Sequence, residues 1–352
     1  FVVKNPGIPY SNRLVVFFEE EKIPIITEIE LALNYAKDYK VAAITGTNGK
    51  TTITTLVHEI LKEEFKSYAC GNIGTALSEI VFEHEDEDAR IALEISAFQL
   101  LDHLDYFDTL DDYYKAKTLV YKNMSGDDWF ILNLDDENCV DYCKDIKCKV
   151  VTFSLDKKAD LCLKGDKVYL FDQELFDKND LKIIGKHNLA NAMMAACLAY
   201  KLGASAEIIN KVITTFKGVE HRIEFVKEVD GVKYYNDSKG TNTDSTVIAL
   251  RSFDKPVILL AGGHDKHTGF DALKNEVDKI GCLITFGETK HLLAELKDDA
   301  IVCETMDEAL DKATSIAKKG DVVLLSPACS SYDQFKNFEE RGRIFKELVN
   351  KL

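Results

Sequence analysis

The chain has 352 residues, of which 46% are hydrophobic and 30% charged, and its formal net charge at pH 7 is −16. A chain of this length usually forms two or three domains of about 150 residues each. The acidic balance argues against nucleic acid or an anionic membrane as the main partner, because both favour a basic surface. The sequence also contains no apolar run of the roughly 18 residues that a membrane-spanning helix requires.

The cysteines and the start of the sequence indicate the compartment. The nine cysteines follow no spacing typical of zinc ligands, so we expect reduced thiols in a cytoplasmic protein. Residues 1–12 do not resemble a signal peptide, since no basic region is followed by a long apolar stretch. Residues 1–4 are strand-like and run straight into a turn at Pro6 and Gly7. We therefore expect that the sequence opens within a domain and that an N-terminal segment precedes it.

Strands alternate with helices along the chain, which is typical of parallel α/β sheets. Residues 1–38 predict a short strand, a turn, a helix, a second strand and a second helix. Residues 40–65 predict a buried strand, a glycine-containing loop and a helix. The other elements predicted before residue 216 are strands at 91–96, 129–135 and 149–155 and a helix at 187–203 that Gly203 would end.

The alternation of strands and helices begins again after Phe216. The predicted strands there are residues 233–238, 256–263, 282–287 and 321–328, with helical stretches such as 271–280 and 306–319 between them. We predict an α/β protein of three parts. These parts are the remnant of an N-terminal α/β domain (1–38), a central P-loop domain with a mostly parallel sheet (39–216) and a C-terminal Rossmann-like α/β domain (217–352).

The strongest chemical signal is the segment TGTNGKTT at residues 45–52, between a predicted strand and a predicted helix. Glycines let backbone N–H groups close around phosphate oxygens, and the helix N-terminus favours negative charge. Lys50 would neutralise the β- and γ-phosphates, and the Thr51 hydroxyl would face Mg²⁺. The spacing GxxGKT is shorter than the common GxxxxGKT, and an ordinary glycine-rich turn is the alternative. The predicted nucleotide-binding residues of this loop are Gly46, Thr47, Asn48, Gly49, Lys50, Thr51 and Thr52.

Glu94 ends the predicted strand at 91–96, where a P-loop enzyme often holds Mg²⁺ with a carboxylate. Taken alone, Glu94 could equally be a solvated strand end. Beside the glycine-rich loop, we interpret it as a metal ligand.

Nine motifs occur in the order found in the Mur ligase family, which the chain resembles over nearly its whole length. They are GTNGKTT (46–52), GNIG (71–74), EISAFQL (94–100), DHLD (102–105), YKAK (114–117), HNLAN (187–191), GVEHRIE (218–224), NDSKGTN (236–242) and SPACSSYDQFKNFEERG (326–342). The last two resemble the D-glutamate-adding members in particular. The resemblance implies a monomer that uses ATP to join D-glutamate to UDP-N-acetylmuramoyl-L-alanine through an acyl phosphate, for peptidoglycan synthesis.

The resemblance also implies roles for individual residues in nucleotide and metal binding. Lys117 matches a lysine that is carbamylated in the family, which would turn an ammonium into a carboxylate-like metal ligand. Two Mg²⁺ ions are implied, with ligands among Thr51, Glu94, His103 and Lys117. The residues implied to bind ATP outside the loop are Asn188 and Asn191 on the adenine side, Arg222 at the γ-phosphate and Asp237 on the ribose side. The implied catalytic residues are Lys50, Glu94, His103, Lys117 and Arg222.

The residues implied to bind the other substrates suit a ligand with carboxylates, which needs cations and hydroxyl donors. Asn72 resembles a contact to the muramoyl substrate, and Lys239 would add positive charge. The positions that match the D-glutamate site are Thr241, Lys266, Ser331, Tyr332 and Phe338. Simpler interpretations remain open: His103 as a surface histidine, Lys117 as a solvated lysine and Phe338 as part of the core.

Two departures from the family pattern stand out. The UDP-binding domain is represented only by its tail, so contacts to uracil and diphosphate cannot be assigned. Gln99 and Leu100 run almost directly into His103, whereas the family has a further strand between these motifs. We expect that this strand is omitted from the printed sequence rather than deleted from the protein.

Two rival functions stay open at this stage. One is another Mur-type ligase, such as folylpolyglutamate synthetase or the lysine- or diaminopimelate-adding enzyme. The other is a nucleotide-binding module without ligase activity.

Overall fold

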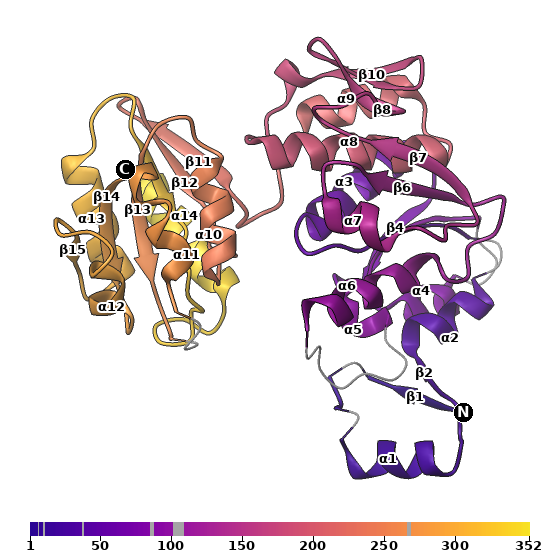
Figure 1. The fold of residues 1–352 in the computed structure, drawn as a ribbon. Coiled ribbons are helices and arrows are strands. Elements are labelled where there is room, and N and C mark those ends of the chain that lie inside the picture. The colour runs from indigo at the N-terminus through magenta and orange to yellow at the C-terminus, as the bar shows by residue number, and fades with distance from the viewer. Residues whose placement is uncertain (6, 10, 37–38, 85–87, 101–108, 266–268) are drawn as a thin grey trace. The chain divides into compact units, whose positions relative to one another are not determined.

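The computed structural model describes residues 1–5, 7–9, 11–36, 39–84, 88–100, 109–265 and 269–352. The chain forms two compact units (Figure 1). Unit 1 consists of Phe1–Lys182 and His187–Phe216, and unit 2 consists of Ile183–Lys186 and Lys217–Leu352. The three-part division predicted from the sequence stays a prediction, and residues 1–38 belong to unit 1.

Unit 1 begins with a small parallel pair of strands and two helices. Strand β1 (Val2–Lys4) pairs with β2 (Ile25–Thr27), and helix α1 (Arg13–Glu20) lies between them in the sequence. Helix α2 (Glu28–Tyr35) follows β2 directly and is capped by Thr27, whose hydroxyl accepts a hydrogen bond from the Glu30 N–H at 3.2 Å.

The first sheet of unit 1 has three parallel strands, β3 (Lys40–Ile44), β5 (Arg90–Glu94) and β4 (Ser67–Gly71), with β5 in the middle. All five residues of β5 are buried, as expected for a central parallel strand. The helices around this sheet are α3 (Lys50–Leu61), α4 (Leu77–Glu83), α5 (Ala97–Leu100) and α6 (Leu110–Thr118).

The second sheet of unit 1 has the strand order β10-β9-β8-β7-β6. Its strands are β6 (Trp129–Asn133), β7 (Lys149–Phe153), β8 (Leu161–Lys164), β9 (Lys167–Leu170) and β10 (Gln173–Asp177). Strands β6, β7 and β8 are parallel, and β8, β9 and β10 form an antiparallel meander that the sequence analysis missed. The remaining helical elements are η1 (Leu119–Tyr121), α7 (Glu137–Tyr142), η2 (Lys178–Asp180), α8 (Lys186–Lys201) and α9 (Ala206–Thr215).

Unit 2 is built on one six-stranded sheet with the order β11-β12-β16-β13-β14-β15. The strands are β11 (Glu224–Val229), β12 (Val232–Asn236), β13 (Val257–Gly262), β14 (Ile280–Phe286), β15 (Ile301–Val302) and β16 (Val322–Leu325). Only the pairing of β11 with β12 is antiparallel among the paired strands of this sheet. The helical elements are α10 (Thr243–Arg251), α11 (Asp271–Lys274), η3 (Val277–Lys279), α12 (Lys290–Ala294), α13 (Met306–Ile316) and α14 (Phe338–Lys351).

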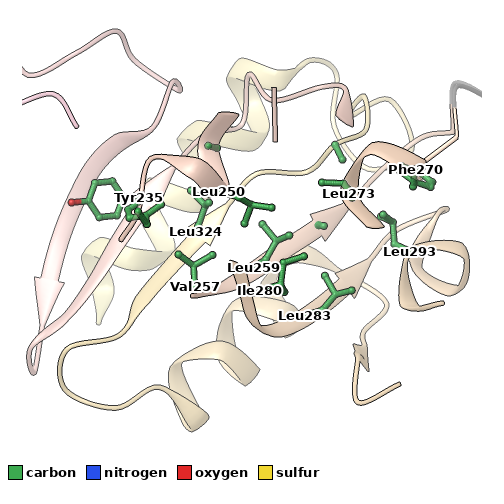
Figure 2. Close-up of a cluster of buried hydrophobic side chains, with 14 of the residues drawn as sticks. Tyr235, Leu250, Val257, Leu259, Phe270, Leu273, Ile280, Leu283, Leu293 and Leu324 are labelled. Carbon is green, nitrogen blue, oxygen red and sulfur yellow. The ribbon is translucent and has the colours of Figure 1, made fainter. Parts of the chain in front are cut away.

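Helices cover both faces of the unit 2 sheet, and each face has its own apolar core. Figure 2 shows one of them, where Leu259 and Leu324 of the sheet lie with Leu250 of α10 and Leu273 of α11. The neighbouring residue Leu260 packs on the other face, in the cluster that also contains Tyr234, Phe286, Phe345 and Val349. This alternation follows from the two-residue period of a strand. The same alternation determines on which face of the sheet the last side chains of β12, β13 and β16 lie, where the following loops begin.

The α/β class predicted from the sequence is confirmed. The helix predicted at 271–280 is wrong in its extent, because α11 ends at Lys274 and Ile280 already belongs to β14. Ile280 is 3% exposed and pairs with Val257, so burial in the sheet outweighs the local helical pattern. Within the described ranges, the helices are too short or too polar to cross a bilayer.

Candidate active site

The segment 45–52 lies at the junction of β3 and α3, as the sequence predicted: residues 45–49 form the loop and residues 50–52 the first turn of α3. Gly49 precedes the first residue of α3 with φ at +81°, and no side chain caps the helix. The N–H groups of the first helical turn, which an α-helix leaves without partners of its own, therefore lie at the loop. The Lys50 ammonium donates to the carbonyl oxygens of Gly46 at 2.8 Å and Thr47 at 3.2 Å. A cation and helix N–H groups thus converge on one short loop, which suits a polyphosphate.

Helix α8 brings the HNLAN motif against this loop. A Cβ atom added to Gly49 would lie 2.4 Å from Oδ1 of Asn191, and the φ of +81° at this position also favours glycine. Asn191 donates through Nδ2 to Oδ1 of Asn188 at 3.2 Å, and both side chains are buried. The structure therefore places Asn191 beside Gly49, with Asn188 hydrogen-bonded to it.

Glu94 is buried at the end of β5, with 3% of its surface exposed. Its Oε1 accepts a hydrogen bond from Nδ2 of Asn72 at 3.1 Å. Its Oε2 is also buried and has no hydrogen-bond partner among the described residues. A buried carboxylate oxygen without a donor is costly unless a cation or water satisfies it. This oxygen therefore fits a Mg²⁺ ligand, since Mg²⁺ prefers oxygen donors.

Glycine at position 71 allows the end of β4 to lie close to the backbone of Glu94. Its φ is +99°, and an added Cβ would lie 2.3 Å from the Glu94 carbonyl oxygen and 2.8 Å from Cδ1 of Leu93. We expect Gly71→Ala to lower the free energy of unfolding by at least about 2 kcal/mol, because both strain and overlap oppose it. Urea unfolding would measure the change.

Gly126→Ala is the matched control for that substitution. No heavy atom of the described chain lies within 4 Å of an added Cβ at Gly126. We expect this variant to unfold at the urea concentration of the original protein. Equal midpoints for the two variants would contradict the role given to Gly71.

A cavity of about 400 Å³ within unit 1 is lined in part by Asn72, the residue that donates a hydrogen bond to Glu94. Its walls come from the N-terminal segment, from the turn after β4 and from the segment that follows β5. The lining residues are Asn5, Gly7, Gly71, Asn72, Ile73, Gly74, Ser96 and Gln99. Polar side chains and backbone dominate this list, so the cavity suits a polar ligand.

Helix α6 carries Lys117 to the glycine-rich loop. The Lys117 ammonium donates to Oγ1 of Thr47 at 3.1 Å and lies 4.1 Å from the centroid of the Tyr113 ring. Burial opposes ionisation of Tyr113, but hydrogen bonds to Lys117 and Thr47 outweigh it and lower its pKa. Tyr113 was not predicted from the sequence, although its spacing of four residues from Lys117 on a helix was a usable signal.

Arg222 and Asp237 come together in unit 2. Nε of Arg222 is buried without a hydrogen-bond partner in the ranges that the structure describes. Asp237 is 4% exposed; its Oδ2 accepts from Oγ of Ser326 at 2.7 Å and its Oδ1 from the Ile223 N–H at 3.2 Å. Burial raises the pKa of Asp237 to about 7, against the lowering effects of these hydrogen bonds and of Arg222 and Arg341.

This raised pKa predicts how stability depends on pH. The folded protein holds the Asp237 proton more tightly than the unfolded chain, so the group favours folding most below about pH 4. The contribution is lost as the pH rises towards 7, and it amounts to at most about 4 kcal/mol. Asp237→Asn should therefore flatten the fall in unfolding free energy between about pH 4 and pH 7 in urea titrations. Asp244→Asn, which removes an exposed carboxylate from α10, should keep the original slope.

Two of the residues implied to bind the substrates, Lys239 and Phe338, lie close together after the ends of β12 and β16. Lys239 lies 5.7 Å from the centroid of the Phe338 ring, and Oγ of Ser238 donates to the Phe338 carbonyl at 2.8 Å. The fully buried guanidinium of Arg341 donates to oxygens of Ser238, Cys329 and Ser330. It therefore ties the segments 236–242 and 326–342 together.

The other predicted positions in these segments differ in exposure. Ser331 is buried, Thr241 is half-buried and Tyr332 is 70% exposed. His103 and Lys266 lie outside the described residues.

One group of potential metal ligands in the described chain consists of Glu220, His221 and Glu224. The Lys346 ammonium donates to Glu220 at 2.9 Å and to Glu224 at 2.5 Å. Since one ammonium is already hydrogen-bonded to both carboxylates, we interpret this group as an ion-pair cluster.

Comparison with known protein families is consistent with this arrangement. The model of the Mur ligase middle domain matches residues 44–101 and 94–199, and that of the Mur ligase glutamate ligase domain matches 221–329. The two stretches of the first match meet at residues 94–101. That junction is where the sequence analysis expects an omitted strand.

Several curated relatives are similar over the whole chain. A protein of Bacillus subtilis (strain 168) named UDP-N-acetylmuramoylalanine--D-glutamate ligase is 42% identical over 376 residues. A protein of Caldicellulosiruptor bescii with the same name is 40% identical over 383 residues. Both alignments cover 100% of this chain and 83% of the relative.

Solved structures share the fold at lower identity. MurF from Acinetobacter baumannii has a TM-score of 0.69 at 16% identity, covering 92% of this chain and 79% of its own. A MurF ligase from Thermotoga maritima in complex with ADP has a TM-score of 0.68 at 18% identity, covering 96% of this chain and 92% of its own.

Proposed function

Since this chain belongs to the Mur ligase family, we propose that it adds D-glutamate to UDP-N-acetylmuramoyl-L-alanine in an ATP-dependent step of peptidoglycan precursor synthesis. The observation that carries the proposal is the convergence of three groups in unit 1. The Lys50 and Lys117 ammonium groups both bond to the loop at 45–52, and the buried Glu94 carboxylate ends the neighbouring strand. This set suits the transfer of a phosphoryl group to an acid.

A free carboxylate is a poor acyl donor, because its leaving group would be a strongly basic oxide. Phosphorylation by ATP solves this problem: a carboxylate oxygen attacks the γ-phosphorus, ADP leaves and an acyl phosphate forms. The amine of D-glutamate then attacks the acyl carbon. The tetrahedral intermediate expels phosphate, the nitrogen loses a proton, and an amide remains. No side chain is assigned as the base for that proton.

The loop residues Gly46 to Thr52 bind the phosphates of ATP in this proposal, and Lys50 offsets their charge. Asn188 and Asn191 form the adenine side, consistent with their position beside Gly49. Arg222 offsets the charge that moves with the γ-phosphoryl group.

Magnesium ions would be held by Thr51, Glu94, His103 and Lys117, at two sites. When bound, they would supply positive charge that screens the phosphate oxygens. The orphaned Oε2 of Glu94 fits this role, and Lys117 fits it only as a carbamate, because an ammonium offers no lone pair.

The substrate UDP-N-acetylmuramoyl-L-alanine, whose carboxylate accepts the phosphoryl group, would occupy the cavity beside Asn72. D-glutamate would bind at Thr241, Lys266, Ser331, Tyr332 and Phe338, with Lys239 adding positive charge. Cations and hydroxyl groups suit an amino acid with two carboxylates. We also propose a cytoplasmic monomer that binds neither nucleic acid nor membranes, in line with its net charge of −16.

The proposal is tested by phosphate release from ATP in the presence of UDP-N-acetylmuramoyl-L-alanine and one amino acid at a time. We expect release with D-glutamate and only background release with L-lysine or meso-diaminopimelate. Phosphate release with another amino acid, and not with D-glutamate, would identify the protein as another Mur-type ligase. Nucleotide binding without amino-acid-dependent release would identify a binding module.

A further inference from the structure

Helix α6, which carries Lys117, has little apolar burial of its own. Among residues 111–118, Ala116 is the one buried side chain. Helix α3, which carries Lys50 to the same loop, has twelve residues and buries seven of them. A helix in a folded protein is stabilised mainly by the apolar face that it packs against its neighbours. The position of α6 must therefore depend on specific contacts with the elements beside it.

Tyr142, the last residue of α7, supplies such contacts. Its hydroxyl donates a hydrogen bond to Oδ1 of Asp111 at 2.5 Å, in the first turn of α6. Its ring centroid lies 5.4 Å from that of Tyr114, one turn further along α6. Its carbonyl oxygen accepts a hydrogen bond from the Tyr121 hydroxyl at 3.3 Å, at the end of η1. One residue of α7 thus contacts α6 at two places and the short helix that follows α6 at a third.

Asp111 has a separate partner for each of its two carboxylate oxygens. Oδ2 lies 2.5 Å from the Lys115 ammonium on the same helix, while Oδ1 accepts from Tyr142. The hydrogen bonds with Lys115 and with Tyr142 lower the pKa of Asp111, and the bond to Asp111 raises the pKa of Tyr142. The Tyr142 bond therefore has a charged acceptor at neutral pH, which makes it stronger than a neutral one. Of these two contacts, the one with Lys115 stays within α6 and the one with Tyr142 joins α6 to α7.

A row of contacts continues along α6 to the glycine-rich loop. The ring centroids of Tyr114 and Tyr113 lie 5.8 Å apart, and the Lys117 ammonium lies 4.1 Å from the Tyr113 ring centroid. The same ammonium donates to Oγ1 of Thr47 at 3.1 Å. Asp111 lies only about 9 Å from Lys117 along the helix axis. A shift at the start of α6 would therefore move the Lys117 ammonium away from Thr47.

We propose that Tyr142 is a positioning residue for Lys117, which it keeps at the glycine-rich loop by holding the start of α6 through Asp111. The inference rests on the proposed function, because it takes Lys117 as a ligand of Mg²⁺ near the ATP phosphates. Loss of the Tyr142 hydroxyl should affect Lys117 and the metal. It should leave unchanged both Lys50, whose helix has its own buried face, and the D-glutamate site.

The chemical reactivity of single lysines tests the position of α6 without any ligand. Reductive methylation by formaldehyde in carbonate-free buffer is followed by peptide mass spectrometry, and the rate at Lys117 is compared with that at Lys50. We expect the Lys117 rate to rise about threefold or more in Tyr142→Phe, because the hydrogen bond that holds α6 is lost. Tyr142→Ala, which also removes the ring contact, should raise it further. The Lys50 rate should stay unchanged in both variants.

Tyr169→Phe is the matched control for removal of a tyrosine hydroxyl. The Tyr169 hydroxyl donates to Oε2 of Glu174 at 2.9 Å, between β9 and β10. This bond also has a carboxylate acceptor, but it lies in another sheet element. We expect Tyr169→Phe to leave the methylation rates of Lys117 and Lys50 unchanged.

The part played by Asp111 is tested by combining substitutions. Asp111→Ala should raise the Lys117 rate about as much as Tyr142→Phe, and the double variant should exceed neither single variant. Lys115→Ala, which removes the other partner of Asp111, should keep the original rate. If the effects of Asp111→Ala and Tyr142→Phe multiply fully, Tyr142 does not act through Asp111 and the inference is overturned.

The metal dependence of phosphate release separates positioning from a general loss of structure. Groups that orient a metal ligand change metal affinity when they are removed. For Tyr142→Ala we therefore expect a lower kcat and a Mg²⁺ concentration for half-maximal activity about threefold or more above the original. The KM for D-glutamate should stay at its original value.

Three results would overturn the inference. They are an unchanged Lys117 methylation rate in folded Tyr142→Ala, an equal rise at Lys117 and Lys50, and a KM for D-glutamate that rises as much as the Mg²⁺ requirement. Absence of D-glutamate-dependent phosphate release in the original protein would instead count against the proposed function. The methylation rates require no substrate, so they would still test the position of α6.

Discussion

Replacement of Lys50 by alanine should abolish ATP turnover, with kcat falling by about 10³-fold or more. Lys50 is the first residue of α3, and its ammonium donates hydrogen bonds to the Gly46 and Thr47 carbonyl oxygens. Its removal takes away the cation at the start of α3, so charge on the transferring phosphoryl group is less well offset. Phosphate release with saturating substrates measures the effect.

Lys62→Ala is the matched control for the Lys50 variant. Lys62 follows the last turn of the same helix, and its exposed ammonium pairs with Glu59 at 2.6 Å. Exposed pairs of this kind contribute little, so we expect ordinary turnover. Normal turnover by a folded Lys50→Ala protein would remove this lysine from the reaction.

Replacement of Lys117 by alanine should also eliminate activity, and added bicarbonate should not restore it. In the original protein, ¹³C-labelled bicarbonate should produce a carbamate carbon signal that Lys117→Ala lacks. The expected loss in kcat is about 10²-fold or more, because a carbamate at this position would hold positive charge near the phosphates. The 3.1 Å contact between the Lys117 ammonium and Thr47 places the side chain at the loop where this charge is needed.

Lys115→Ala controls for changes in helix α6. Lys115 lies two residues earlier, is exposed and pairs with Asp111 at 2.5 Å. We expect this variant to keep both its activity and the labelled carbamate. An active Lys117→Ala protein, or a carbamate signal that survives in it, would show that Lys117 is not the modified ligand.

Much of the fold was predictable because its signals are local. A buried strand, a glycine-rich loop and an amphipathic helix follow each other within residues 40–65, and they form as predicted. The meander at 161–177 was missed because its three strands have four or five residues each and carry charged residues at their turns. Such strands are stabilised by their partners and not by their own periodicity.

By itself, the sequence determined the α/β class, the position of the phosphate loop and the family, because these depend on the order and spacing of residues along the chain. Only the tertiary structure decided which side chains meet: Asn191 against Gly49, Tyr113 against Lys117, and Asp237 against the turn that carries Arg222. Burial and hydrogen-bond geometry determine those contacts. Both arise when distant segments pack together, and neither is encoded in the spacing of a motif.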